Sequence, residues 1–236
     1  MSSIRVCGLH LLFGVLLLNA TTSRTISAEE EIADQKPAGK VVQLFDGKTL
    51  KNWKITRFGG EGDVRVEDEM LIIDQGEPIT GVTWDGPELP RVNYEISFDA
   101  QRVQGNDFFC ALTFPVKKDP CSLILGGWGG TVIGLSNINN FDASENDTTD
   151  YFSFENKKWY KVRVRVDDQF IQCWLDEDQI VKVDHTQERI SIRIEMELSK
   201  PLGIATFQTR GAIKNMQLVH LKTENAATSK EANPAP

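Results

Sequence analysis

The chain has 236 residues, of which 40% are hydrophobic, and its 34 acidic residues outnumber 26 basic ones to give a net charge of -8. This composition predicts a globular protein with enough apolar residues for a sizeable core. The acidic balance, without a cluster of basic residues, argues against nucleic acid or an anionic membrane surface as a partner, because little in the chain would neutralise phosphates.

The N-terminus has the pattern of an export signal. Arg5 precedes an apolar run over residues 6–18, and small polar residues follow over 19–23. This order is typical of a cleavable signal peptide, and the run is shorter than the roughly 20 residues of a membrane span, which disfavours the alternative of a signal anchor. We predict a signal peptide over residues 1–20, with residue 28 as the latest alternative for cleavage. The protein is therefore expected to be secreted or periplasmic, with no membrane span in the mature chain.

Composition also predicts the domain boundaries. Residues 21–40 are mostly polar and acidic, and residues 222–236 are Ala, Pro and polar residues without periodicity. Both segments are predicted to be disordered, as a linker and a tail. Residues 41–221 remain as one domain, about the size of a single β-sandwich.

Short alternating segments within that domain predict strands. Apolar and polar residues alternate over 94–100, 108–114, 190–196 and 203–209, with Gly, Pro, Asn or Asp between the segments. A helical period is nowhere sustained. Many short strands separated by turn residues favour an all-β fold of two packed antiparallel sheets, as in a jelly roll or a concanavalin A-like or laminin G-like sandwich.

Three acidic residues in or just after the first of these strands bear on acid–base chemistry. Glu95 and Asp99 share a strand face but lie about 13 Å apart at ~3.3 Å per residue, beyond either separation used by glycosidases. Asp107 follows Gly105 and Asn106 and precedes an apolar strand, where a loop delivers side chains to a sheet edge. The alternative for Asp107 is a residue that caps a turn.

The cysteines of the mature chain are expected to be buried thiols. Removal of Cys7 with the signal leaves Cys110, Cys121 and Cys173, an odd number for an exported protein. A hairpin around residues 115–120 would place Cys121 opposite about Phe114, so a bridge to Cys110 would need another register. We therefore favour apolar, buried thiols, with at least one of them free or paired between chains.

Motifs for zinc or nucleophilic catalysis are missing from the sequence. With His10 in the signal, only His185 and His220 remain, and neither a His pair at ligand spacing nor a CxxC occurs. The GxSxG nucleophile elbow is also missing. We therefore expect no metal or cofactor, with calcium as the one alternative. It would be held in the oxygen-rich loop from Asp142 to Asp150, although the spacing there matches no EF-hand.

The glycine-rich segment Gly126–Gly130 contains a single large side chain, that of Trp128. The segment lacks the Lys-Ser/Thr of a phosphate-binding loop, so its glycines are better explained by a tight bend that projects this tryptophan. Trp128 then either stacks on a sugar or is buried where the chain crosses between strands.

The clearest hairpin flanks Asp167-Asp168, with strict alternation over Tyr160–Val166 and Gln169–Leu175. A two-residue loop would set Val162 opposite Cys173, and Val164 opposite Ile171, on a core-facing side. The opposite face would carry a mixture of cationic, aromatic and amide side chains: Lys161, Arg163, Arg165, Phe170, Gln172 and Trp174. Such a face is either solvated or binds a ligand.

Leu-Phe-Asp-Gly-Lys-Thr-Leu-Lys-Asn-Trp over residues 44–53 closely resembles the opening signature of the 3-keto-disaccharide hydrolase domain family. The similarity continues in segments 94–99, 158–164, 173–176 and 202–211, so it extends over nearly all of the predicted domain. The resemblance implies a concanavalin A-like sandwich, export, and action on glycosides whose C3 hydroxyl has been oxidised to a ketone.

This implied chemistry needs a base and a cation. A 3-keto group acidifies the C2 proton, so a base can form an enolate and expel the C1 substituent while a cation or hydrogen-bond donor stabilises the oxyanion. The candidate bases are Asp107 and Asp99. The candidate substrate-binding residues are Trp128, Arg163, Arg165, Trp174, Gln208 and Arg210.

Two other functions remain open from the sequence. Gly105-Asn-Asp-Phe stands where the family commonly has Gly-Asn-Ser-Gly, and Arg210 where it often has His. These departures favour a non-catalytic carbohydrate-binding module, in which aromatic and polar side chains grip a sugar without a poised carboxylate. A third hypothesis is an envelope adhesion domain that only presents loops.

Overall fold

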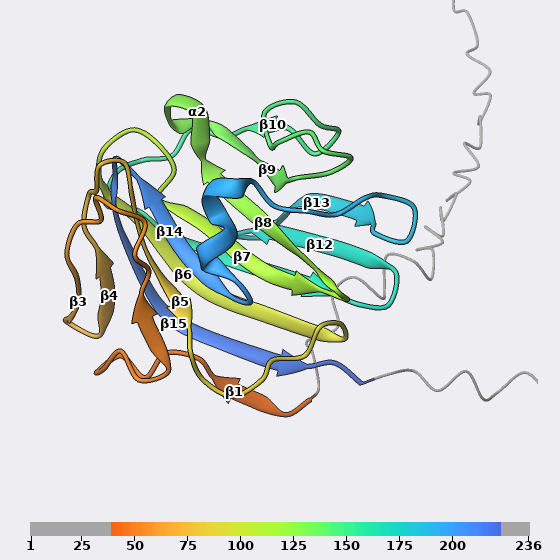
Figure 1. The fold of residues 1–236 in the computed structure, drawn as a ribbon, viewed down its shortest axis with the longest axis horizontal. Coiled ribbons are helices and arrows are strands. Elements are labelled where there is room, and N and C mark those ends of the chain that lie inside the picture. Colours follow the sequence, from red (N-terminus) through yellow and green to blue (C-terminus); the bar gives the residue numbers. More distant parts are fainter. Residues whose placement is uncertain (1–38, 223–236) are drawn as a thin grey trace, which may run out of the picture. The chain divides into compact units, whose positions relative to one another are not determined.

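The computed structural model describes residues 39–222, which form two antiparallel β-sheets (Figure 1). The predicted signal peptide, nearly all of the predicted linker and all but the first residue of the predicted tail lie outside this range. No helix within residues 39–222 has both the length and the apolar character needed to cross a membrane. The expected all-β sandwich is confirmed.

The first sheet, sheet A, has the strand order β13-β12-β11-β6-β15-β4-β3, with β1 pairing to β15. Its strands are β1 (Val41–Gln43), β3 (Val64–Glu67), β4 (Met70–Ile73), β6 (Tyr94–Gln104), β11 (Trp159–Val166), β12 (Phe170–Leu175), β13 (Asp178–Asp184) and β15 (Arg210–His220). Strands far apart in sequence, such as β6 and β15, are neighbours, so the sheet forms only when distant parts of the chain meet.

The second sheet, sheet B, has the order β10-β9-β8-β7-β14-β5-β2. Its strands are β2 (Trp53–Ile55), β5 (Ile79–Trp84), β7 (Cys110–Val116), β8 (Asp119–Gly126), β9 (Val132–Ser136), β10 (Asp150–Tyr151) and β14 (Gly203–Phe207). Two short segments interrupt the strands: α2 (Gly127–Gly130) joins β8 to β9, and the 3-10 helix η1 (Ile194–Ser199) precedes β14.

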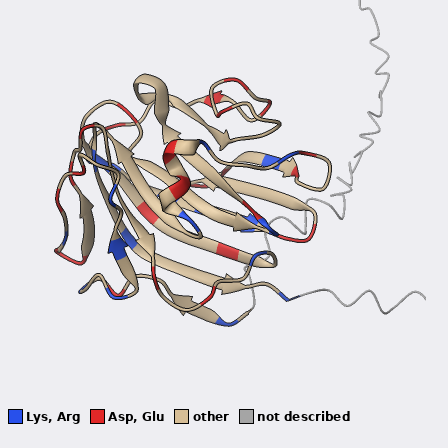
Figure 2. Ribbon diagram, viewed as in Figure 1, with Lys and Arg blue, Asp and Glu red and all other residues tan. Residues whose placement is uncertain are grey.

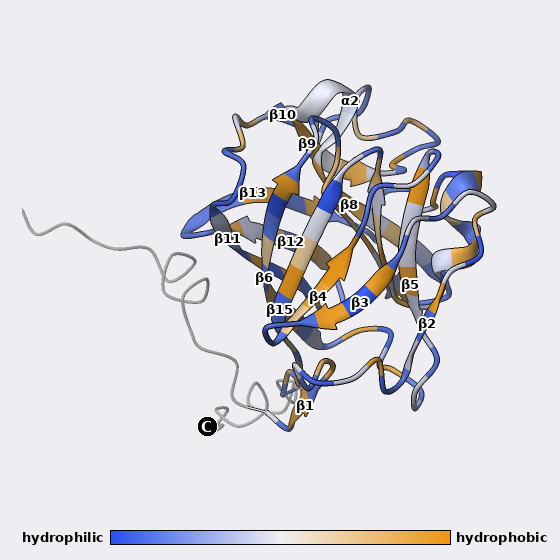
Figure 3. Ribbon diagram, turned by 90° about the vertical axis from the view of Figure 1, so that its left-hand side faces the viewer, coloured by the Kyte–Doolittle hydropathy of each residue, from blue (hydrophilic) through white to orange (hydrophobic). Residues whose placement is uncertain are grey.

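The core lies between the sheets because alternate residues of each strand face inward. Tyr94 of sheet A is fully buried and donates a hydrogen bond from Oη to the Pro115 carbonyl of sheet B at 2.6 Å. Strands β4, β5 and β15 contain many hydrophobic residues, whereas the loops at the strand ends are mostly hydrophilic (Figure 3).

The three cysteines of the described chain are buried, free thiols, as expected. Cys121 lies opposite Phe114, which confirms the register that argued against a bridge to Cys110. Burial disfavours the charged thiolate and raises the pKa of Cys121 to about 12. These thiols therefore act as apolar core groups and not as nucleophiles.

The β11–β12 hairpin has a different register from the predicted one. Val164 lies opposite Cys173, and Val166 opposite Ile171, because four residues (167–170) rather than two separate the last paired residues of the two strands. The Asp167 carboxylate accepts hydrogen bonds from the backbone N–H groups of Gln169 and Phe170, which closes this longer turn. The shift is by two residues, so the apolar side chains still face the core.

The strand predicted over residues 190–196 is wrong. Ile190 forms only an isolated bridge, and the chain turns into η1 at Ile194. The alternation of isoleucines reflects packing on two sides: Met196 is buried against sheet B, whereas Ile194 is 82% exposed. This turn matters for the site, because it carries charged residues onto the outer face of sheet B.

Candidate functional site

The outer face of sheet B is lined by unusually small side chains. The strand register sets one cross-strand row of Gly81, Ala205, Ala111, Ile124 and Gly134. The next row is Thr83, Gly203, Thr113, Ser122 and Ser136, and the Thr113 and Ser122 hydroxyls are hydrogen-bonded at 2.9 Å. Small side chains leave room above the sheet, and the hydroxyls supply donors and acceptors.

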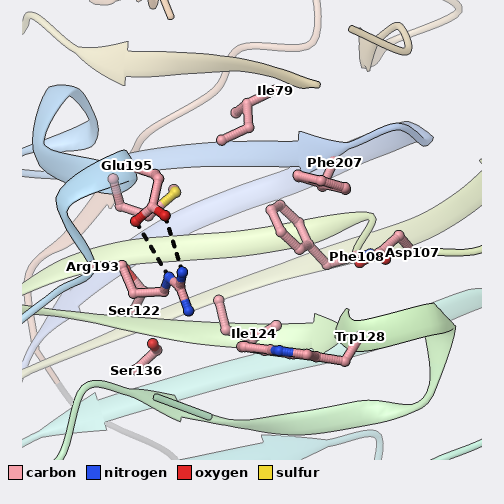
Figure 4. A pocket seen from close by; sticks show the side chains of 11 residues that line it. Ile79, Asp107, Phe108, Ser122, Ile124, Trp128, Ser136, Arg193, Glu195 and Phe207 are labelled. Carbon is pink, nitrogen blue, oxygen red and sulfur yellow. Dashed lines mark hydrogen bonds and ion pairs between the residues drawn. The ribbon is translucent and has the colours of Figure 1, made fainter. Parts of the chain in front are cut away.

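A cavity of about 240 Å³ occupies this space, and we call it the trough. Its lining comes from sheet B, from η1 and from the loops at the ends of β6 and β8 (Figure 4). The lining residues are Ile79, Asp107, Phe108, Ser122, Ile124, Trp128, Ser136, Arg193, Glu195, Met196 and Phe207. A mostly apolar hollow with a few polar groups is the usual form of a small-ligand site.

One side of the trough is charged. Arg193 forms a two-point ion pair with Glu195, whose Nη2–Oε1 and Nε–Oε2 distances are 3.0 and 3.3 Å. Nη1 of Arg193 also donates to the carboxylate of Asp142. The acidic residues of η1 are visible beside sheet B in Figure 2. A guanidinium held by two carboxylates has a fixed position, which suits it to orient a ligand.

The ion pair predicts the response of the trough to acid. The hydrogen bond from Arg193 lowers the pKa of Glu195 below its ordinary value of 4.5. A carboxyl whose folded-state pKa is depressed stabilises the fold above 4.5 and loses that contribution as the pH falls through the folded-state value. We therefore expect Glu195 to be more than half ionised at pH 4.5.

An NMR titration of the glutamate carboxyl carbons, with Glu195→Gln to assign the signal, measures this pKa. Arg193→Gln should return the value toward 4.5, because the opposing charge is then gone. A Glu195 midpoint at or above 4.5 in the unmodified protein would contradict the pairing.

The opposite side of the trough is aromatic. The rings of Phe108 and Phe207 are tilted against each other with centroids 5.6 Å apart, and Trp128 of α2 is 44% exposed. Trp128 and Gly129 have left-handed backbone angles, with φ of 48° and 89°. This tight turn, which the flanking glycines permit, confirms that the glycine-rich segment projects Trp128 instead of burying it.

Asp107 fixes this turn from the trough side. Its Oδ2 accepts a hydrogen bond from the Gly129 N–H at 3.1 Å, and its Oδ1 accepts one from the Phe108 N–H at 2.7 Å. From below, Arg102 donates to the carbonyl oxygens of Gly130 and Phe154. Burial lowers the pKa of Arg102. Its guanidinium connects the loop that contains Gly130 to the segment that contains Phe154.

The segment between β9 and β10 closes one end of the sheet B face. The Thr148 carbonyl approaches so closely that a Cβ at Gly134 would lie 2.8 Å from it. Within this segment Asn146 donates to three backbone carbonyls, and Asp142 accepts from Ser144. Both carboxylate oxygens of Asp142 are thus used by donors, Oδ1 by Ser144 and Oδ2 by Arg193. Residues 39–222 hold no group of three His, Cys, Asp or Glu side chains that would suit a metal, and calcium stays a prediction.

Two of the residues predicted for the site, Asp107 and Trp128, line the trough. Three others, Arg163, Arg165 and Trp174, gather on the outer face of sheet A. The Arg163 guanidinium lies 4.0 Å from the Trp174 ring centroid, and Arg165 pairs with Glu95 at 2.9 Å. The sequence predicts that these three side chains share one sheet face, and they do. They contact one another, however, and do not line the trough.

The remaining predicted residues lie elsewhere. Asp99 on β6 accepts a hydrogen bond from Asn215 at 2.6 Å, and Arg210 at the start of β15 pairs with Asp74. Gln208 occupies the turn between β14 and β15 with φ of 45°. None of these three is among the residues that line the trough.

Sequence reasoning missed Arg193 and Glu195. Both lie in the segment assigned to a strand, where charged residues two apart interrupt isoleucines. Residues i and i+2 share a strand face, so a complementary pair at this spacing signals a local charge contact. That signal identifies the pair but not its place over sheet B, which depends on η1.

Solved structures show the same fold at low sequence identity. The Crh5 transglycosylase in complex with NAG matches with a TM-score of 0.53 and 10% identity over 79% of this chain and 86% of that one. A point mutant of the Emp46p carbohydrate recognition domain matches with a TM-score of 0.51 and 10% identity over 73% and 90%. A Bacillus subtilis protein with a galectin-like fold matches with a TM-score of 0.50 and 10% identity over 78% and 97%.

These identities establish the architecture alone. No curated protein matches the chain in sequence. A family model does match, over residues 40–219, which is nearly all of the part that the structure describes. The match includes the opening signature at residues 44–53, and the chain belongs to the 3-keto-alpha-glucoside-1,2-lyase-like domain family.

Proposed function

We propose that the trough binds a glycoside and cleaves it when its C3 carries a ketone. The observation that carries this proposal is the arrangement in Figure 4, where an aromatic side with Trp128 and Phe207 faces a charged side with Arg193 and Glu195. Aromatic rings suit the apolar face of a sugar, whereas the guanidinium suits its oxygens. Family membership supplies the 3-keto chemistry.

Asp107 is the better base of the two carboxylates lining the trough. Glu195 is held in an ion pair with Arg193, whereas Asp107 has no ion-pair partner among residues 39–222. Its oxygens each accept one backbone hydrogen bond, and a carboxylate has about four acceptor sites. Asp107 can therefore take the C2 proton, as predicted, while Asp99 lies on the other sheet.

Arg193 provides N–H donors for the enolate oxygen. Three of its five N–H groups bond to Glu195 and Asp142, which leaves two for a substrate oxygen. Loss of the C2 proton to Asp107 places negative charge on O3. The C1–O bond then breaks, and the leaving oxygen takes the proton from Asp107, which releases the aglycone and an unsaturated 3-keto sugar and restores the carboxylate. Water addition to that double bond completes hydrolysis. Glu195 and Asp142 act as positioning residues.

One observation favours a non-catalytic glycan-binding module as the second candidate. Asp107 accepts from Gly129 and Phe108 through both oxygens, so its carboxylate also has a purely structural use in shaping the aromatic side. In that case the trough would hold a sugar without turnover.

Incubation with a 3-keto-glucoside and with its unoxidised parent separates the two functions. The lyase or hydrolase releases the aglycone from the ketone alone, and a binding module binds the glucosides but releases nothing. Release from both substrates at equal rates would show that the ketone is irrelevant and would overturn the proposed mechanism.

The aromatic side leads to a prediction on affinity. Trp128→Ala removes an exposed ring from the rim, and we expect the dissociation constant for a glycoside to rise about tenfold or more, from lost apolar contact area. Isothermal titration calorimetry measures the change. Tyr151→Ala is the matched control, since Tyr151 is 69% exposed but does not line the trough. An equal loss in both variants would contradict the role of Trp128.

We also propose export, on the basis of the apolar run over residues 6–18 behind Arg5. Expression of the full chain in a bacterial host, followed by mass spectrometry of the secreted or periplasmic fraction, should detect a mature N-terminus just after residue 20 or as late as residue 28. Retention of the whole chain in the cytoplasm would contradict the proposal.

A further inference from the structure

A second depression, of about 780 Å³, lies where the β7–β8 turn meets the segment that follows β13. It has the volume of a typical small-ligand site. The residues around it are Val116, Lys117, Lys118, Asp119, His185, Thr186, Glu188, Arg189, Ile190 and Ser191. None of these residues lines the trough, so the depression is a separate feature of the sandwich.

The depression is cationic in an otherwise acidic chain. Lys117, Lys118 and Arg189 are exposed, and within residues 39–222 none of their charged groups forms an ion pair or a side-chain hydrogen bond. In contrast, Arg193 of the trough is held by two carboxylates. Three cations that converge on one hollow without internal partners create a local field that attracts anions.

A buried histidine adds a second, independent observation. His185 is only 7% exposed, and its Nε2 must donate to the Asp167 carbonyl, 2.9 Å away, because a carbonyl only accepts. Its Nδ1 is buried without a partner among the described residues. Buried polar atoms are nearly always satisfied, so this nitrogen of a lining residue lacks the partner that a ligand group or an ordered water usually supplies.

The acidic residues of the depression reduce the positive field but do not cancel it. Glu188 is engaged by Asn139, whose Nδ2 donates to its carboxylate. Asp119 is the other carboxylate of the lining, so three cations face two anions. Replacement of Asp119 by Asn should therefore strengthen the binding of an anion.

We propose that this depression binds sulfate or carboxylate groups carried by a glycan. The cations receive the anionic group, and the Thr186 and Ser191 hydroxyls of the lining can hydrogen-bond the sugar that carries it. Arg189 and Arg193 are four residues apart, so their Cα atoms are at most about 14 Å apart even in a fully extended chain. An anionic group held here would thus lie close enough to the trough to anchor the same chain. The site is independent of turnover and goes beyond the proposed function.

Calorimetry on the full chain tests the proposal with three probes. They are a sulfated dextran oligosaccharide, its unsulfated parent of the same length, and inorganic sulfate. We expect the sulfated oligosaccharide to bind most tightly, with an affinity that falls as salt rises. The combined change Lys117→Gln, Lys118→Gln and Arg189→Gln should weaken it about tenfold or more.

A control variant with the same loss of charge is Lys48→Gln, Lys51→Gln and Lys157→Gln, all at exposed lysines outside the depression. It should bind the sulfated oligosaccharide as the unmodified protein does. An equal loss in both variants, or equal affinities for the sulfated and unsulfated oligosaccharides, would overturn the proposal. Inorganic sulfate binding as tightly as the oligosaccharide would show a site for free anions and would overturn the glycan assignment. Aglycone release is measured separately, so its failure affects only the trough.

Discussion

Asp107→Asn is expected to lower kcat for 3-keto-glycoside cleavage by about 10²- to 10⁴-fold, the usual contribution of a general base. The amide has the size of the carboxylate but cannot take a proton from C2. It can still accept one of the two backbone hydrogen bonds that Asp107 receives from Phe108 and Gly129. Single-turnover measurement of aglycone release tests the expectation without interference from product release.

Two further variants separate chemistry from loop shape. Asp99→Asn removes the other candidate carboxylate, which lies on sheet A beside Asn215, and should leave kcat unchanged. Thr209→Val removes a hydroxyl that accepts the Asp107 N–H at 3.1 Å and disturbs the same turn without altering a carboxylate. A loss of kcat in Asp99→Asn, or an Asp107→Asn variant with full activity, would contradict the proposed base.

The contrast between the two outer sheet faces explains where the site lies. On sheet A the cations Arg163 and Arg165 are matched by Glu95 and stacked on Trp174, which is 4% exposed. On sheet B, glycine and alanine leave the space that a ligand needs. A hollow thus follows from the absence of side-chain volume, whereas a charged face by itself does not create one.

The fold could be predicted because alternation is a local signal. The segments at 94–100 and 108–114 fall within β6 and around β7, and the shared face of Arg163 and Trp174 follows from their strand positions. The length of the loop after Val166 could not be predicted from alternation, because it depends on the Asp167 carboxylate capping the turn.

The site was harder to predict than the fold because its parts meet only in three dimensions. Asp107 and Trp128 could be predicted because nearby glycines in the sequence indicate a loop or a tight bend at each position. Arg193 and Glu195 reach the trough because η1 turns the chain over sheet B, and the same pattern of isoleucines is compatible with a strand. Which outer face is hollow depends on the assignment of strands to sheets, and that assignment is a tertiary property.

Arg102→Met is expected to lower the free energy of unfolding by about 2–4 kcal/mol, because it leaves several buried acceptors without donors. Arg102 is 8% exposed, and it donates to the Asn156 side chain at 2.7 Å as well as to the Gly130 and Phe154 carbonyls. Methionine fills similar space but donates nothing. Urea denaturation monitored by circular dichroism measures the change.

The same substitution should also weaken glycoside binding, because the Gly130 carbonyl follows the turn that presents Trp128 and is tied down from this side by Arg102. Arg102→Lys, which keeps a charge but has no planar fork, should fall between Arg102→Met and the unmodified protein in both stability and affinity. Arg57→Met is the surface control, since the Arg57 side chain is 79% exposed and its loss should cost less than about 1 kcal/mol. If Arg102→Met were no less stable than Arg57→Met, the two loops would be held by their own backbone contacts, and the positioning of Trp128 would not depend on this buried guanidinium.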